Sequence, residues 1–198
     1  MIEFQNDNKE MPYIRFKELY NLALEKNQTQ IEAILIASYD SELKEVDARY
    51  VNLKFIDNNK FIFFSNLESP KSKQFKSHDQ ISAVLHWKSI NAQIRMKAKI
   101  SKLSSDLSNA YFKNRDVSKN ALAISSMQSK KIASYKKVEE NFNSILKNEN
   151  LTICPNYWGG FVFTPYYFEF WEGQEYRLNK REAYEMSKNQ WDKYFMQP

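Results

Sequence analysis

Glycine is rare in this chain, which contains only three glycines among its 198 residues. Average usage of about 7% would give roughly 14. Gly159 and Gly160 are adjacent, and Gly173 stands alone. Neither a Gly-rich phosphate loop nor a dinucleotide-binding fingerprint can be built from them. A nucleotide-like ligand would therefore have to be held by side chains.

The remaining composition indicates a folded protein with few metal-binding or redox-active side chains. Hydrophobic residues make up 42% of the chain and charged residues 27%, which is enough for a core. One cysteine, Cys154, excludes an internal disulfide framework, and with only His78 and His86 besides we expect no metal site. No apolar run approaches the roughly 18 residues that span a bilayer, and residues 1–7 lack a signal-peptide layout. We therefore expect a cytoplasmic location.

The basic residues are mostly lysine, and the net charge is +5. The six arginines are Arg15, Arg49, Arg95, Arg115, Arg177 and Arg181. Arginine suits a bidentate grip on phosphate or carboxylate, although composition alone leaves a chance scatter equally open. Because the lysines are dispersed along the chain, an anionic small ligand is favoured over nucleic acid.

The hydrophobic pattern predicts several hairpins with helices between the later strands. A helix is expected at 12–27, where Pro12 suits the first turn. Strands are expected at 33–39, 49–56, 60–65, 81–87, 92–103 and 161–170, with a bulge near Pro165. A short helix follows Ser69, and helices are expected at 106–114, 117–128 and 135–147. The pattern indicates a single domain over 1–198, α+β and mainly β, with a helical insert at about 104–149.

The chain lacks the usual signatures of protein-based catalysis. It contains no nucleophile elbow, no HExxH motif, no Walker motif and no paired-carboxylate signature. His86 lies within a predicted strand and is more simply structural, and Cys154 has no neighbour that would lower its pKa. An enzyme built from these residues would need a cofactor to supply the reactive group.

The strongest local signal is an aromatic strand that runs into Gly173 and a basic return segment. If the return segment is extended, Arg177, Asn179 and Arg181 share one face, with Trp171 as a flat apolar wall. This arrangement suits a planar, anionic ligand. The alternative is an aromatic core strand followed by exposed basic residues.

Seven short motifs occur in order along residues 49–198. They are RYVNLK at 49–54, FFSNLESPK at 63–71, QIR at 93–95, YFKNR at 111–115, SMQS at 126–129, WGG at 158–160 and EFWEGQEYRLNKR at 169–181. In this order and spacing they resemble the pyridoxine (pyridoxamine) 5′-phosphate oxidases, FMN enzymes with an antiparallel, Greek-key-like split β-barrel. Five of the six arginines fall inside the motifs, which favours a functional role for them.

The resemblance implies a set of FMN contacts. Arg49, Ser65, Lys71, Gln128 and Ser129 would hold the phosphate and ribityl chain. The backbone of Tyr50, Val51, Asn52 and Leu53 would line the flavin, and Lys54 and Phe64 belong to the same set. Gln93, Trp171 and Arg181 would contact the ring region.

The resemblance also implies a substrate site and a reaction. Lys54, Tyr111 and Arg115 would grip the phosphate of a vitamin B6 substrate, with Ser118 close by. Arg177 would lie over the pyridine ring, and Arg177 and Asn179 would be the catalytic pair. Hydride would pass from the substrate to FMN, oxygen would reoxidise the flavin and yield hydrogen peroxide, and the enzyme would be a homodimer with FMN at the interface.

Four positions depart from the family pattern. Pro70 replaces an arginine, Lys119 a serine, Asn179 a histidine, and Phe195 stands in an altered C-terminal motif; residues 41–48 also lack the usual turn. Asparagine can hydrogen-bond a substrate but cannot hold a proton near neutral pH. These departures leave open a relative that acts on another ring compound, as in phenazine biosynthesis, or a non-catalytic flavin or pyridoxal-phosphate binding protein. A basic barrel that binds nucleic acid is the least favoured alternative.

Overall fold

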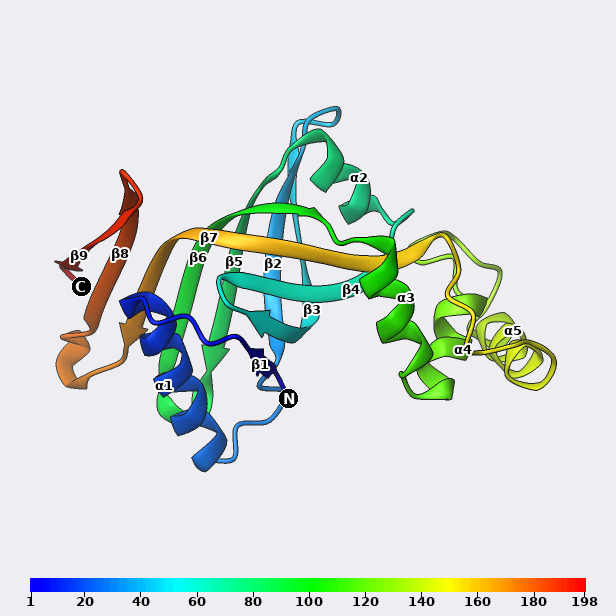
Figure 1. The fold of residues 1–198 in the computed structure, drawn as a ribbon, viewed down its shortest axis with the longest axis horizontal. Coiled ribbons are helices and arrows are strands. Elements are labelled where there is room, and N and C mark those ends of the chain that lie inside the picture. Colours follow the sequence, from blue (N-terminus) through cyan, green and yellow to red (C-terminus); the bar gives the residue numbers. More distant parts are fainter.

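Six antiparallel strands close into a ring around the main core (Figure 1). The computed structural model describes residues 1–198 apart from the side chain of Asn148. The ring consists of β2 (Ala33–Asp40), β3 (Glu45–Asp57), β4 (Lys60–Asn66), β5 (Gln80–Trp87), β6 (Ala92–Lys102) and β7 (Trp158–Glu172). It closes because β4 pairs with both β3 and β7. Closure removes the sheet edges, as expected for a small barrel.

Strand β7 extends beyond the ring and connects it to a second group of strands. Its first half pairs with β4, and its second half pairs with β8 (Lys180–Ser187), which pairs with β9 (Gln190–Met196). The register between β6 and β7 shifts opposite Pro165, which confirms the bulge predicted there. A short strand, β1 (Glu3–Gln5), runs parallel to β3.

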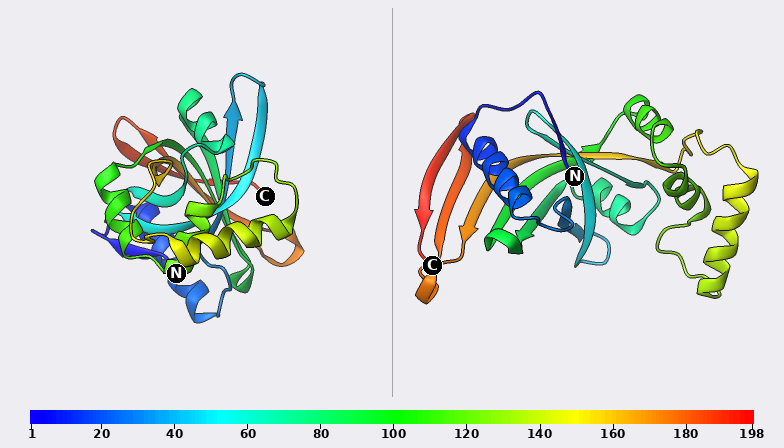
Figure 2. Two further views of the ribbon diagram at one scale, coloured as in Figure 1. Left: turned by 90° about the vertical axis from the view of Figure 1, so that its right-hand side faces the viewer. Right: turned by 90° about the horizontal axis from the view of Figure 1, so that it is seen from below.

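Most of the helices lie at the two ends of the molecule (Figure 2). Helix α1 (Met11–Glu25) lies on the side of β8 and β9, and its buried residues join the core. Helices α3 (Ser105–Lys113), α4 (Val117–Ser125) and α5 (Tyr135–Asn148) lie at the opposite end, and α2 (Pro70–Ser77) follows β4. Two short 3₁₀ turns, η1 (Lys88–Ile90) and η2 (Glu175–Arg177), complete the chain. No described helix is long and apolar enough to cross a membrane.

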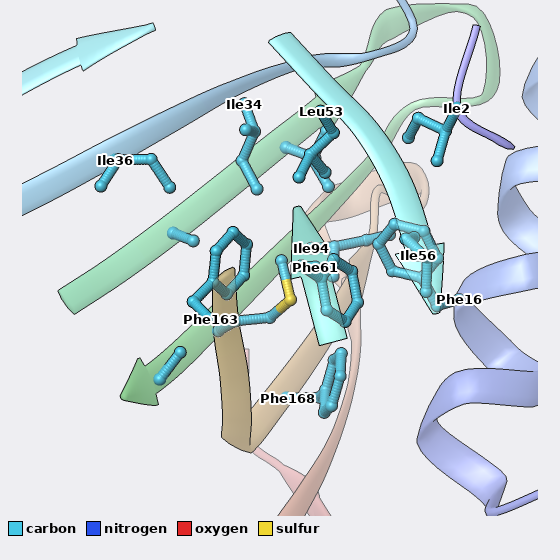
Figure 3. Packing of buried hydrophobic residues seen from close by; sticks show 14 of the residues in the cluster. Ile2, Phe16, Ile34, Ile36, Leu53, Ile56, Phe61, Ile94, Phe163 and Phe168 are labelled. Carbon is cyan, nitrogen blue, oxygen red and sulfur yellow. The ribbon is translucent and has the colours of Figure 1, made fainter. Parts of the chain in front are cut away.

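The core inside the ring is aliphatic and aromatic (Figure 3). Phe61 and Phe163 stack with ring centroids 5.1 Å apart, and Phe168 lies 6.3 Å from Phe61. Leu53 of β3 is fully buried among them. Side chains alternate along a strand, so burying Leu53 turns Asn52 and Lys54 away from the core.

Asparagine takes over the turn positions that glycine usually fills. Asn58 between β3 and β4 and Asn91 between β5 and β6 have left-handed backbones, with φ of 54° and 48°. Asparagine tolerates this region better than most residues because its short side chain can bond locally. Gly173 matters for a different reason, since a Cβ there would lie 2.1 Å from the side-chain nitrogen of Asn91 and would force that side chain to move.

Candidate functional site

A cleft of about 700 Å³ opens between β3, β4 and the helices at the α3–α4 end of the ring. This volume falls within the range of typical small-molecule sites. Many of the residues predicted from sequence line it, namely Arg49, Tyr50, Val51, Asn52, Lys54, Phe64, Ser65, Lys71, Tyr111, Arg115, Gln128 and Ser129. Leu53 does not line the cleft, and its side chain lies in the core.

Arg49 and Lys71 form a first group of cations in the cleft. Arg49 is oriented by hydrogen bonds from Nη1 to Ser38 Oγ (2.6 Å) and from Nη2 to Gln74 Oε1 (2.8 Å), and it pairs with Asp47 at the rim. Lys71, in the first turn of α2, is only 6% exposed and forms no ion pair with a described side chain.

The environment of Lys71 disfavours its charge. Burial and, to a smaller extent, the Arg49 charge lower the pKa of Lys71 to about 8, against the opposing effect of Asp47. A cation that is buried beside another cation is stabilised when an anion enters the site. The first group is therefore suited to an anionic ligand.

Gln128 fixes the loop that follows α4 against this group. Its side-chain oxygen accepts hydrogen bonds from Ser65 Oγ (3.1 Å), Lys71 Nζ (3.3 Å) and the Asn66 backbone N–H (3.4 Å). Helix α4 ends at Ser125, earlier than the predicted 128, and Ser129 has a left-handed φ of 68°. The loop conformation brings Gln128 and Ser129 to the rim of the cleft.

Lys54, Arg115 and Lys119 form a second group of cations in the same cleft. The Arg115 guanidinium lies over the Trp158 ring, 4.6 Å from its centroid. Its Nη1 atom is buried without a hydrogen-bond partner among the described residues. Burial lowers the pKa of Arg115, and burial together with Lys119 and Arg115 lowers the pKa of Lys54, against the opposing effect of Glu32.

The carboxylate of Asp116 also lines the cleft but forms no ion pair with these cations. Asp116 caps α4, where it accepts from the backbone N–H groups of Ser118 (2.9 Å) and Lys119 (3.3 Å). The Ser118 hydroxyl also donates to Asp116, and Ser118 does not line the cleft. The neighbouring Lys119, which departs from the family's serine, lines the cleft in place of the predicted Ser118.

Three parallel aromatic rings form one wall of the cleft. Phe64 stacks on Tyr111 with centroids 3.9 Å apart and on Trp158 at 5.3 Å. Burial raises the pKa of Tyr111, so its hydroxyl remains protonated at neutral pH and can donate a hydrogen bond. The wall is flat and apolar and carries donors at its edge.

Gln93, Trp171 and Arg181 lie in one cross-strand row over β6, β7 and β8. Arg181 donates from Nε (3.0 Å) and Nη2 (2.8 Å) to one oxygen of Glu169, whose side chain is 3% exposed. Arg95 Nη1 donates to the other Glu169 oxygen at 3.0 Å. Glu169 was not predicted as a site residue, although its spacing of two residues from Trp171 places both on one face of the strand.

The return segment after Gly173 is not extended, so the predicted common face is wrong. Tyr176 and Arg177 in η2 have left-handed φ values of 53° and 61°. The Asn179 side-chain oxygen accepts from the Gln174 backbone N–H at 3.1 Å, and β8 begins only at Lys180. Arg177 and Asn179 therefore lie on a tight turn, separate from the strand face that carries Arg181.

Within a single chain, the cleft lies far from the residues around β8, namely Gln93, Trp171, Arg177, Asn179 and Arg181. Trp158 lines the cleft, whereas Trp171 lies near the other end of the same strand. At about 3.3 Å per residue the two ends are tens of ångströms apart. Figures 1 and 2 place α3 and α4 at one end of the molecule and β8 and β9 at the other.

The fold defines the class of protein. PhzG from Burkholderia lata, solved with tetrahydrophenazine-1-carboxylic acid, superposes with a TM-score of 0.90 over 97% of this chain and 95% of PhzG, at 22% identity. A pyridoxamine 5′-phosphate oxidase-related, FMN-binding protein from Nostoc punctiforme gives 0.76 over 92% and 97%, at 14% identity. The fold is the split β-barrel of FMN-binding proteins.

Sequence comparison gives the family. A model described as the pyridoxine 5′-phosphate oxidase C-terminal dimerisation region matches residues 158–198. A pyridoxine/pyridoxamine 5′-phosphate oxidase from Rippkaea orientalis is 31% identical over 94% of this chain and 89% of its own length. One from Hydrogenovibrio crunogenus is 32% identical over 90% and 83%. The chain therefore belongs to the pyridoxine/pyridoxamine 5′-phosphate oxidase family of oxidoreductases, which confirms the resemblance.

Proposed function

We propose that this protein is an FMN-dependent oxidase that converts pyridoxamine or pyridoxine 5′-phosphate to pyridoxal 5′-phosphate and releases hydrogen peroxide. The observation that carries this proposal is one cleft with two groups of cations, in which Lys71, Lys54, Arg115 and Lys119 form no ion pair with a described side chain. Two anionic groups, one on the cofactor and one on the substrate, match this arrangement. Family membership supplies the reaction class.

The first cation group fits the phosphate of FMN. Arg49 and Lys71 offer charged donors, and the Ser65 hydroxyl and the Gln128 amide lie beside them. Side-chain donors would bind the phosphate here, where other folds use the backbone N–H groups of a glycine-rich loop. Pro70 withdraws one donor that the family resemblance leads us to expect, so Arg49 and Lys71 carry more of the binding. Bound FMN would accept two electrons from the substrate and pass them to oxygen.

The second cation group fits the phosphate of the substrate. Lys54 and Arg115 provide the charge, the Tyr111 hydroxyl adds a neutral donor, and the aromatic wall provides apolar contact. No titratable base in the cleft is needed, because the cofactor carries the chemistry. The protein would bind the substrate, orient it and exclude water from it.

We propose a homodimer in which each active site uses both ends of the chain. Arg177, Asn179, Gln93, Trp171 and Arg181 lie far from the cleft of their own chain. A site that contains both groups therefore requires a second copy. The match of residues 158–198 to a dimerisation region supports this arrangement. The Asn179 side-chain oxygen already accepts from the Gln174 backbone N–H, which orients the amide and leaves its NH2 group to donate to the substrate.

Purified protein should be yellow, show a flavin spectrum, and form pyridoxal 5′-phosphate and peroxide from pyridoxamine 5′-phosphate in air. A flavin-loaded protein that produces neither compound would reject the proposed substrate but not the family.

A second candidate function is oxidation of another ring compound. It is favoured by the high structural similarity to PhzG, which was solved with a carboxylated tetrahydrophenazine, and by Asn179 in place of the family's histidine. Under this alternative, Asn179→His should raise activity on pyridoxamine 5′-phosphate, and the unmodified protein should prefer the carboxylated ring.

A further inference from the structure

The cation group formed by Lys54, Arg115 and Lys119 carries more positive charge than a single carboxylate can balance. Three basic side chains line this end of the cleft, and Asp116 in the same lining is hydrogen-bonded to the first backbone N–H groups of α4, which it caps. Lys119 forms no ion pair with a described side chain. The charge at this end is therefore left for a ligand to balance.

The charges of Arg115 and Lys119 also act on Lys54. Burial lowers the pKa of Lys54, and Lys119 and Arg115 lower it further while Glu32 opposes them. Arg115 keeps a buried nitrogen without a hydrogen-bond partner among the described residues. A dianionic group relieves more of this repulsion than a monoanion does, because it can pair with two or more cations at once.

Lys119 is placed to complete such a site. It occupies the first turn of α4, and its backbone N–H bonds to Asp116, so the helix fixes the position from which the side chain reaches the cleft. Ser118 is not an alternative donor, because its hydroxyl is bonded to Asp116. Lysine is also long and flexible, which allows its ammonium group to follow a ligand.

We propose that Lys119 is a specificity-determining residue that, with Lys54 and Arg115, selects a dianionic phosphate monoester over a monoanionic carboxylate. This inference rests on the proposed function and refines it by naming a residue that sets the preference among its ligands. It separates the two candidate functions by the charge of the ligand.

The test measures binding to FMN-loaded protein by titration calorimetry, which needs no turnover. The ligands are pyridoxal 5′-phosphate, pyridoxal and phenazine-1-carboxylate. The unmodified protein should bind the phosphate ester most tightly. Lys119→Met should weaken binding of pyridoxal 5′-phosphate about tenfold, as for the loss of one charge-assisted contact. It should change pyridoxal binding less than twofold, and Lys119→Arg should restore most of the loss.

Lys113→Met is the matched control, because Lys113 is an exposed lysine at the end of α3 that does not line the cleft. Equal losses in the two methionine variants, or equal losses for pyridoxal and its phosphate, would overturn the inference. Unmodified protein that binds the phosphate ester through Lys119 but does not oxidise pyridoxamine 5′-phosphate would reject the proposed function alone. Oxidation that is unaffected by Lys119→Met, with unchanged phosphate binding, would reject the inference alone.

Discussion

Arg115 in the cleft and Arg181 on β8 are the same residue type in opposite situations. Arg181 is paired with the buried carboxylate of Glu169 and also donates to the Gln197 backbone oxygen at 2.9 Å. Arg115 stacks on Trp158 and keeps a buried nitrogen without a partner among the described residues. A satisfied arginine stabilises the fold, whereas an unsatisfied one has binding capacity left for a ligand. The comparison predicts that mutations around Arg181 mainly reduce stability, whereas mutations around Arg115 mainly reduce ligand binding.

The largest effect on folding is expected at the satisfied end. Glu169→Ala removes the carboxylate that holds Arg95, Arg181 and the Tyr167 hydroxyl. Removing one partner from a buried ion pair costs about 3 kcal/mol, because the remaining charges lose their compensation. Urea denaturation of the apoprotein should show this loss in the free energy of unfolding. Glu139→Ala on the exposed surface of α5 serves as the control, and an equal, small change in both variants would contradict the assignment.

The largest effect on cofactor binding is expected at Arg49. Arg49→Ala removes a charged donor from the group that we assign to the FMN phosphate, and the loss should weaken FMN binding about a hundredfold, or about 2.7 kcal/mol. Quenching of flavin fluorescence on titration with apoprotein would measure it. Lys73→Ala, an exposed lysine on α2 outside this cleft, should bind FMN normally. Unchanged FMN affinity in Arg49→Ala would remove the phosphate assignment.

Mutation of Arg115 should leave stability almost unchanged and weaken ligand binding, the reverse of the effect expected at Glu169. Arg115→Met keeps an apolar chain over Trp158 while removing a partly buried charge, so the free energy of unfolding should change by less than about 0.5 kcal/mol. Binding of pyridoxal 5′-phosphate to the FMN-loaded variant should weaken about thirtyfold. If Arg115→Met lowers the free energy of unfolding but leaves ligand binding unchanged, Arg115 is a structural arginine like Arg181 and the contrast between them is wrong.

The same comparison shows which parts of the structure could be predicted from sequence. Alternation of apolar side chains marked the hairpins and the bulge at Pro165, because a strand with one buried face repeats every two residues. Ring closure could not be predicted, since β4 meets β7 across about a hundred residues and no local pattern encodes that register. The cleft residues were found through motifs, but the unpartnered state of Arg115 required the packing around it.

The turn before β8 shows the limit of pattern reading in a chain with few glycines. Tyr176 and Arg177 adopt left-handed backbones, which residues with such side chains rarely do, so their residue types gave no signal for the turn. The turn at Asn58 differs, because Asp57-Asn58-Asn59 is a sequence typical of turns. Glu169 was missed for a related reason. Its role depends on ion pairs with Arg95 of β6 and Arg181 of β8, which only the sheet pairing brings next to it.

The smallest predicted effect concerns pH and again depends on an unsatisfied cation. The pKa of Lys71 is lowered to about 8 by burial and by Arg49. Below pH 8 the side chain is protonated in both the folded and unfolded chain. Between pH 8 and the unfolded value near 10.4 the unfolded chain binds more protons, so this group makes the apoprotein more stable as pH rises.

FMN affinity should follow the opposite trend, because a bound phosphate requires Lys71 to be charged. Above pH 8 binding must take up a proton, so the affinity for FMN should fall about tenfold between pH 7 and pH 9. Fluorescence titrations at pH 7, 8 and 9 would measure the change, and Lys71→Met should bind more weakly at pH 7 and lose most of the pH dependence. If Lys71→Met keeps the full pH dependence, another group is responsible, and Lys71 does not contact the phosphate in the charged form.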